Sequence, residues 1–396
     1  MTEARFRWDS RAALFVQGRR LGDGEPAPGL GADLWALRRA IADGHEFAVG
    51  ADGVQVVSDT SAAPGFFRTS SGGSTGRAKS IRRAQASWIR SFDINRAHLG
   101  LKASDASAVL SQPAHSLGLY GVIEAAHIGA DIHVLAGISP KRQAALINEN
   151  TVTVLYATPT QLGQLARAGL PMPGLRHILC GGGRMPAGLA ARIATLCPAA
   201  TLIEFYGAAE TSFVAWGAGD RPEGSVGKAY PGVEIRIDAS AGGPGEIWVK
   251  SPYLFDSYAQ SASAETRWRD GYLSVGEIGR LDRDGHLFIT GRLGRRVTIA
   301  DQSVSPEDIE TLLLDQPGIG ACAVLPVADA RRGLVLIAVL SDAISDAATE
   351  QLLQLCRAKV GPLAAPRRVL VMPDFPLLAS GKPDLVAIAK WLEGRA

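Results

Sequence analysis

Short apolar runs recur through the middle of the chain, and each is followed by a glycine-rich turn or by a stretch with helical spacing. The runs cover residues 108–110, 132–135, 152–156 and 176–179. Strands that alternate with helices are typical of a mostly parallel sheet covered by helices. The pattern therefore predicts an α/β fold whose ligands lie beyond the carboxyl ends of these strands.

Residues 1–65 carry the weakest signals. The apolar spacing of residues 34–41 predicts a helix with Asp33 as its N-cap. Residues 47–57 read as two short strands around the hairpin signal Ala51-Asp-Gly53. Residues 81–99 read as a helix that packs behind the preceding loop.

The pattern changes twice toward the C-terminus. Between residues 224 and 292, alternating strands are broken by Gly-Gly-Pro, Ser-Pro and Asp-Gly, which predicts a small β subdomain. After it, a helix starting at Ser305 as N-cap, with Pro306 in the first turn, opens an α+β unit. The expected strands and helix are 234–238, 245–250, 286–290, 319–327, 334–340, 347–360 (the helix) and 368–372. The pattern thus indicates a separate C-terminal unit, and the motif resemblance given below implies its boundary and mobility: a large domain over 1–292 and a small mobile C-terminal domain over 293–396.

Composition excludes several classes of function. The 396 residues carry a formal net charge of only +2, which argues against nucleic acid as a partner. Four cysteines without CxxC or metal spacing predict free thiols in a reducing compartment. No run approaches the length of a membrane span and no leader segment is evident, so we expect a soluble, cytoplasmic protein without a membrane partner.

The stretch Thr69–Ser80 concentrates glycines, hydroxyl-bearing residues and a lysine. Glycines let the backbone bend around an oxyanion, while hydroxyls and amides donate to it, so the loop suits a polyphosphate. It is not a Walker loop, because two residues separate Gly76 from Lys79. Taken alone, such a run is equally compatible with a flexible surface linker.

Four later motifs, in a fixed order, decide between these readings. They are Tyr206-Gly-Ala-Ala-Glu210, Gly276-Glu277 with Asp284-Gly285, Gly291-Arg292 leading to Pro306–Glu310, and Ser380-Gly-Lys382. Together with Ser71–Lys79, they resemble the signatures of the adenylate-forming superfamily, which includes acyl- and aryl-CoA synthetases, peptide-synthetase adenylation domains and luciferases. The resemblance extends from Ser71 to Lys382.

The resemblance implies roles for individual residues. It implies that ATP is bound by Ser71, Gly72, Gly73, Ser74, Thr75, Gly76, Lys79, Gly182, Gly183, Arg184, Phe205, Tyr206, Gly207, Ala208, Glu277, Arg292 and Lys382. It places Lys382, Glu210, Thr75 and His115 in catalysis, with Glu210 as the ligand of Mg²⁺. The carboxylic acid substrate would contact His115, Ser116, Tyr120 and Gly207. For the other histidines, a structural role is the simpler reading.

The chain also departs from the superfamily's pattern. Ala209 stands where a threonine is usual, which removes one hydroxyl contact to the α-phosphate. Glu277 replaces an aspartate that binds the ribose, Gly294 occupies the position of the hinge residue, and Asp301 replaces a glycine beside the pantetheine tunnel. The segment before the phosphate loop is shorter than usual, which leaves open the contacts that it normally makes.

The implied chemistry is activation of a carboxylate. Negative charge spreads over the α-phosphate as pyrophosphate leaves, so Lys382, the loop donors and Mg²⁺ on Glu210 would stabilise the transition state. A carboxylate nucleophile needs no general base, which agrees with the lack of an evident acid–base pair.

The loop form Ser-Gly-Gly-Ser-Thr-Gly most resembles that of aryl-acid-activating members. We therefore expect a small, hydroxybenzoate-like acid and transfer of the acyl group to the phosphopantetheine thiol of an acyl carrier protein, with CoA as the close alternative. A non-catalytic nucleotide-binding scaffold is a third hypothesis, against which the retention of Lys79, Glu210, Arg292 and Lys382 argues. The oligomeric state stays open.

Overall fold

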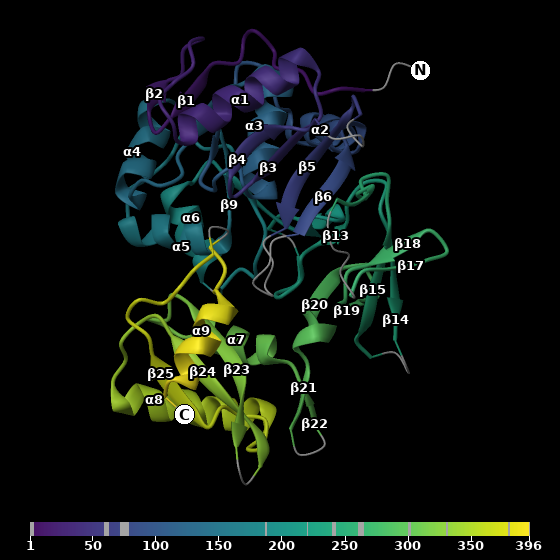
Figure 1. Cartoon of the computed structure of the whole chain (residues 1–396). Helices are drawn as coiled ribbons and strands as arrows, with labels where there is room; N and C mark the ends of the chain where they lie inside the picture. Colours follow the sequence, from purple (N-terminus) through teal and green to yellow (C-terminus); the bar gives the residue numbers. More distant parts are fainter. Residues whose placement is uncertain are drawn as a thin grey trace.

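A nine-stranded sheet forms the centre of the computed structural model (Figure 1). The structure describes residues 4–58, 63–71, 79–186, 188–219, 221–239, 243–259, 265–299, 302–329, 332–378 and 381–395. The sheet has the order β13-β12-β11-β10-β9-β7-β8-β1-β2. Its strands are β1 (Leu14–Val16), β2 (Arg19–Arg20), β7 (Ala106–Val109), β8 (Asp131–Val134), β9 (Val154–Ala157), β10 (His177–Cys180), β11 (Thr201–Ala208), β12 (Ser212–Gly217) and β13 (Lys228–Ala229).

The five central strands β8, β7, β9, β10 and β11 are parallel, as the apolar runs predict. Helices connect them: α3 (Ser116–Ile128), α4 (Pro140–Glu149), α5 (Pro159–Ala168) and α6 (Leu189–Leu196). Side chains alternate across the sheet, so Tyr156 and Leu179 join one hydrophobic cluster while Leu155 and Ile178 join the other. Burial on both faces explains why these strands are continuously apolar.

A second sheet, of order β16-β6-β5-β3-β4, lies beside the first. It contains β3 (Phe47–Gly50), β4 (Gly53–Val56), β5 (Phe66–Ser71), β6 (Lys79–Ala84) and β16 (Ser257–Tyr258), and it neighbours α1 (Leu30–Asp43) and α2 (Gln85–Leu99). The predicted hairpin around Gly53 is confirmed. Two expectations are wrong: α1 begins at Leu30 after Gly29, so Asp33 lies inside its first turn, and residues 81–84 are strand rather than helix.

The charged residues of β6 prevented its prediction as a strand from the sequence. Ile81 and Arg83 face the interior, whereas Arg82 lies on the opposite face. An arginine at a buried strand position breaks the expected alternation of apolar and polar residues, so the sequence does not separate the strand from the helix that follows.

A third, six-stranded sheet is the predicted β subdomain. Its strands are β14 (Glu234–Asp238), β15 (Gly245–Lys250), β17 (Arg267–Arg269), β18 (Tyr272–Ser274), β19 (Glu277–Leu281) and β20 (Leu287–Arg292). All pairings are antiparallel. The strand β19 begins at Glu277 and its antiparallel partner β20 ends at Arg292, which places these two residues opposite each other.

A small C-terminal domain follows the 3₁₀ turn η1 (Leu293–Arg295). It contains β21 (Val297–Ile299), β22 (Gln302–Val304), α7 (Pro306–Leu314), β23 (Cys322–Asp329), β24 (Gly333–Leu340), α8 (Asp346–Val360), β25 (Arg368–Val371) and α9 (Leu385–Glu393). Ser305 precedes α7 as expected, but its hydroxyl donates to the carbonyl of Thr290 instead of capping the helix. Figure 1 shows this domain packed below the central sheet, with the loop before α9 reaching up to α5.

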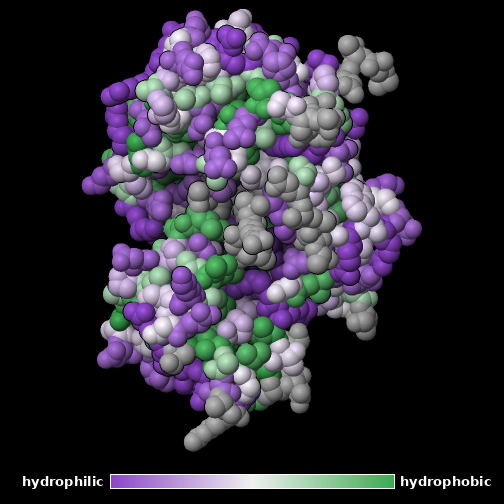
Figure 2. Space-filling view, viewed as in Figure 1, coloured by the Kyte–Doolittle hydropathy of each residue, from purple (hydrophilic) through white to green (hydrophobic). Residues whose placement is uncertain are grey.

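Hydrophilic side chains cover much of the face shown in Figure 2, and hydrophobic residues form smaller patches between them. In the described part of the chain, no helix has the length and apolar character needed to cross a membrane.

A buried carboxylate holds the second sheet together. Glu46 has no exposed side-chain surface and accepts hydrogen bonds from Arg68 at 2.9 Å and from Arg82 at 3.1 Å. We predict that Glu46→Gln lowers the free energy of unfolding by about 2–3 kcal/mol, because two arginines lose their shared counter-charge. Glu350→Gln, at the exposed pair with Arg357, is the matched control and should cost less than about 0.5 kcal/mol. Urea denaturation of both variants measures the difference, and equal losses would contradict the prediction.

Candidate functional site

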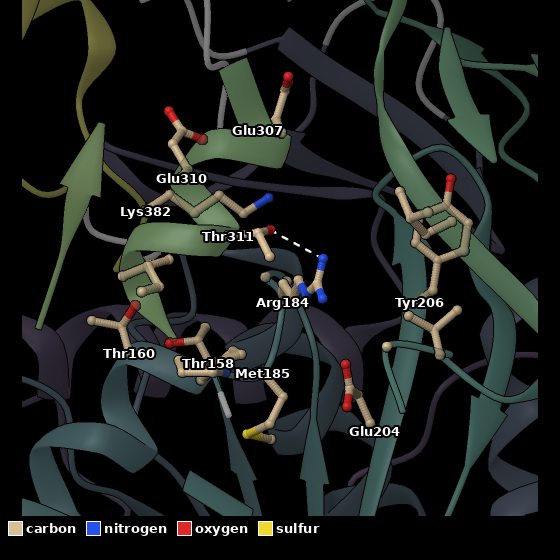
Figure 3. A pocket seen from close by; sticks show the side chains of 18 of the residues that line it. Thr158, Thr160, Arg184, Met185, Glu204, Tyr206, Glu307, Glu310, Thr311 and Lys382 are labelled. Carbon is tan, nitrogen blue, oxygen red and sulfur yellow. Dashed lines mark hydrogen bonds between the residues drawn. The ribbon is translucent and has the colours of Figure 1, made fainter. Parts of the chain in front are cut away.

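A cleft of about 570 Å³ lies between the C-terminal domain and the carboxyl ends of the central strands. Its size falls within the range of small-molecule sites. Figure 3 shows Lys382 and Thr311 on the side of the C-terminal domain, with Arg184, Glu204 and Tyr206 opposite them. The site therefore occupies the edge of the sheet that the strand order predicts.

The turn after β10 carries two glycines that the local packing and backbone conformation require. A Cβ atom on Gly181 would lie 2.3 Å from the ring of Phe205, and Gly182 has a φ of 86°. Both positions therefore require glycine. Gly182, Gly183 and Arg184 line the cleft next to Phe205 and Tyr206, as the sequence predicts for a base-binding turn.

The motif Tyr206–Glu210 covers the end of β11 and the first residues of the tight turn that leads into β12. The hydroxyl of Thr211 accepts a hydrogen bond from the Ala208 amide at 2.9 Å, and Ser212 adopts a φ of 58°. A Cβ atom on Gly207 would lie 2.0 Å from the carbonyl oxygen of Ser212. This constrained geometry fixes where the residues of the motif point.

Glu210 lies at the end of this turn and is 8% exposed. The hydroxyl of Tyr258 donates to its Oε1 at 2.8 Å, and Tyr258 also pairs with Thr266 at 2.7 Å. No residue in the described ranges hydrogen-bonds its second oxygen. A carboxylate oxygen that is held in place and left without a protein partner has the donor chemistry that Mg²⁺ prefers when phosphate oxygens supply the remaining ligands.

Glu277 and Arg292 form an ion pair of 2.5 Å beside Tyr206. The carboxylate of Glu277 raises the pKa of Arg292, so the guanidinium stays charged. Both side chains line the large cleft together with Tyr206. The pair thus brings together two residues that the motifs assign to the nucleotide.

Lys382 reaches this site from the loop before α9. The loop closes on itself, because the Leu378 amide donates to the Lys382 carbonyl at 2.7 Å, and Gly381 adopts a φ of 78° near Thr158. Burial, followed by the repulsion of Arg292, lowers the pKa of Lys382 to about 8, although Glu277 and Glu210 oppose this shift. The ammonium group is therefore only partly protonated at mildly alkaline pH.

A smaller cavity of about 160 Å³ adjoins the cleft, and Lys382 lines both. Its walls include four aromatic side chains: Trp88, Tyr120, Phe205 and Phe213. Ser116, Gly207 and Ala208 also line it. The structure therefore brings the residues predicted to contact the acid into one cavity, at the lysine.

His115 lies in this smaller cavity and immediately precedes α3. Its Nε2 atom is buried and has no hydrogen-bond partner among the residues that the structure describes. Burial, with a contribution from Lys382, lowers the pKa of His115, so the imidazole is neutral near pH 7. A neutral ring with an unpaired nitrogen is able to bond a ligand.

The hydroxyl of Tyr120 is turned away into a buried polar network. It pairs with Ser91 at 2.8 Å and accepts from Asn95 at 3.1 Å, and Asn95 donates to Glu124 at 2.8 Å. Tyr156 donates to the same carboxyl group. Burial raises the pKa of Glu124 to about 7. Tyr120 thus offers the acid cavity a ring held firmly by a network that the sequence did not reveal.

The phosphate loop joins β5 to β6. Ser71 pairs with Lys79 across this hairpin, and Ser70 lines the smaller cavity. The ends of the loop therefore lie beside the predicted acid site. Gly72, Gly73, Ser74, Thr75 and Gly76 lie outside the described residues, as does the side chain of Ser71, so their assigned roles stay predictions. Asp301 also lies outside them.

One further hydrogen bond joins the two sides of the cleft. Arg184 donates to the hydroxyl of Thr311 at 3.1 Å across the cleft (Figure 3). At Gly294, a Cβ atom would lie 1.9 Å from the Oε1 atom of Glu265. A larger residue at the expected hinge position would therefore require the Glu265 side chain to shift.

The fold and the cleft are those of AMP-binding enzymes. The family model of AMP-binding enzymes matches residues 67–259, and that of their C-terminal domain matches residues 308–382. The chain belongs to the adenylate-forming superfamily.

Individual relatives are similar over most of this chain. An uncharacterised acyl–CoA ligase, YhfT, of Bacillus subtilis is 29% identical over 339 residues, covering 83% of this chain and 69% of its own length. A 3-hydroxybenzoate–CoA ligase of Aromatoleum sp. is 28% identical over 334 residues, covering 79% and 63%. The crystal structure of the anthranilate CoA ligase AuaEII with anthranoyl-AMP superposes with a TM-score of 0.73 at 22% identity, covering 83% and 68%. The matched part of this chain thus spans 69% of the length of YhfT and 63% of the length of the 3-hydroxybenzoate–CoA ligase.

The lowered pKa of Lys382 is directly measurable. Only the neutral amine reacts with acetic anhydride, so we predict that competitive labelling of Lys382 rises with a midpoint near pH 8. Exposed Lys141 serves as the internal reference. Glu277→Gln should move the midpoint to lower pH, because it removes an anion that favours the ammonium form. A midpoint above pH 10 would show that Lys382 is solvated.

Proposed function

We propose that this protein activates a small aromatic carboxylic acid with ATP, releasing pyrophosphate, and transfers the acyl group to a phosphopantetheine thiol. The observation that carries the proposal is the position of Lys382, which lines both the large cleft and the small aromatic cavity. A cation at this junction is placed to act where a carboxylate meets an α-phosphate.

The dimensions of the small cavity support the choice of acid. About 160 Å³ accommodates a single ring with small substituents, and four aromatic walls favour a flat, apolar body. Among the described residues that line it, Lys382 and His115 are the only ones able to carry a positive charge. The described lining therefore offers no further cation for a second carboxylate. Relatives named for 3-hydroxybenzoate and anthranilate are consistent with this substrate class.

In the first half-reaction, the formation of the acyl adenylate, the residues would have the following roles. Gly182, Gly183 and Tyr206 would take the base, and Glu277 with Arg292 would hold the ribose and phosphate side of the nucleotide. The Nε2 atom of neutral His115 would orient the substrate carboxylate without adding a charge. Protonated Lys382 would bond the oxygens between acid and phosphate as negative charge grows there.

Glu210 would hold Mg²⁺, as its fixed and partly unpaired carboxylate fits such a ligand. The ion, when bound, supplies charge neutralisation on the phosphate oxygens. Tyr258 keeps the carboxylate in place for that purpose.

ATP–pyrophosphate exchange tests the first half-reaction. With benzoate, 3-hydroxybenzoate and 4-hydroxybenzoate we expect exchange, whereas palmitate should give none because the cavity is too small. Malonate and 2-succinylbenzoate should be poor substrates for lack of a second cation. Lys382→Ala should lower exchange by about 100-fold or more, while Lys390→Ala, on α9 of the same domain, should leave it unchanged. Exchange only with long-chain acids would remove the aromatic assignment.

The acceptor is the second part of the proposal. The relatives' names support CoA, and the carrier-protein thiol predicted from the sequence is the alternative. Thiolation assays distinguish the two acceptors. Preformed acyl adenylate is supplied in parallel to the enzyme with CoA and to the enzyme with a phosphopantetheinylated carrier protein. We expect thioester formation with at least one of them. Exchange without transfer to either thiol would restrict the proposal to adenylate formation.

A further inference from the structure

A fully buried arginine lies behind the turn that carries Glu210. Arg83 has no exposed surface. Its guanidinium donates to the carbonyl oxygen of Ala209 at 2.5 Å and to that of Tyr253, and it approaches the hydroxyl of Ser87 at 3.5 Å. No carboxylate of the described ranges lies within ion-pair distance of it. Removing an unpaired cation from water is costly, so its contacts with this turn must offset a large desolvation penalty.

The peptide that Arg83 contacts has a defined direction. The chain has no cis peptide bond among its described residues, so the carbonyl of Ala209 and the amide of Glu210 point to opposite sides. With the carbonyl directed at the guanidinium, the Glu210 N–H points away from Arg83. Ala208 and Ala209 line the acid cavity, so the turn separates the arginine from that cavity.

Two successive amides of this turn have no acceptor among the described residues. The Ala208 amide is bonded to Thr211, but no described residue accepts from the amides of Ala209 or Glu210. Successive backbone amides without partners form a concave site for an anion. A cation on the carbonyl oxygen polarises the peptide and strengthens its N–H as a donor.

We propose that Arg83 is a positioning residue for adenylation: it fixes and polarises the Ala209–Glu210 peptide so that the Glu210 amide donates to the negative charge developing between acid and phosphate. This donor would replace the threonine hydroxyl that is absent at Ala209. The proposal rests on the proposed function for its reaction. Its ligand is the anionic phosphoryl group that links acyl group and adenosine: the carboxylate oxygen bonds to the α-phosphorus while the bond to the departing pyrophosphate breaks, and the group is tetrahedral in the resulting adenylate.

The test uses the full chain and a stable mimic of that centre, 5′-O-(N-benzoylsulfamoyl)adenosine. We expect Arg83→Met to weaken binding of this compound at least tenfold, measured by calorimetry, while the affinity for adenosine changes less than twofold. Benzoate-dependent exchange should fall in kcat by about 10- to 100-fold. Ser87→Ala, which spares both carbonyl contacts, is the matched control and should leave both values unchanged.

Rescue distinguishes positioning from a merely structural role. Ala209→Thr in the Arg83→Met background should recover part of the lost exchange, since a hydroxyl again reaches the anionic centre. The proposal would be overturned by any of three results. These are equal weakening by Arg83→Met of the binding of adenosine and of the sulfamoyl compound, no loss of binding or of exchange in that variant, and no restoration of exchange by Ala209→Thr in its background. If Arg83→Met does not fold by circular dichroism, Arg83→Lys carries the same comparisons, because lysine keeps the charge but does not bridge both carbonyls. Failure of the wild-type protein to exchange with any acid would instead refute the proposed function, and the binding arm would still decide the role of Arg83.

Discussion

One ammonium group, that of Lys382, connects the two cavities, and the arrangement of charges around it governs the cleft. Arg292 repels it, while Glu277 and Glu210 attract it. Arg292 stays charged and is held by its ion pair with Glu277, whereas Lys382 lines both cavities and is placed at their junction. This balance exists only while the C-terminal loop rests against Thr158 at the start of α5. The site is therefore a property of two folding units in contact rather than of either one.

Much of this architecture could be predicted from the sequence. The parallel strands follow from short apolar runs that are buried on both faces, and the motif residues Tyr206, Glu277, Arg292 and Lys382 line one cleft. Motifs far apart in the chain could be combined because parallel strands bring their carboxyl ends to one edge.

The remaining features depend on buried polar residues. Arg83, Glu124 and Tyr258 belong to types that are usually exposed or only partly buried, so a pattern of apolar and polar positions gives no sign of their role. Arg83 interrupts the alternation of apolar and polar residues that would have indicated the strand β6. Glu124 lies within α3, and a glutamate in a helix is ordinarily expected to face the solvent. Their positions follow from tertiary contacts between segments more than twenty residues apart, which local sequence does not encode.

The glycine at position 294 has a consequence for substitution at the boundary between the domains. The carboxylate of Glu265 lies in the volume that a Cβ atom would need there. Any larger residue therefore requires this side chain to shift, which is a small cost for the flexible end of a glutamate. The two positions are thus coupled in this arrangement, and a change at Gly294 is accommodated through Glu265.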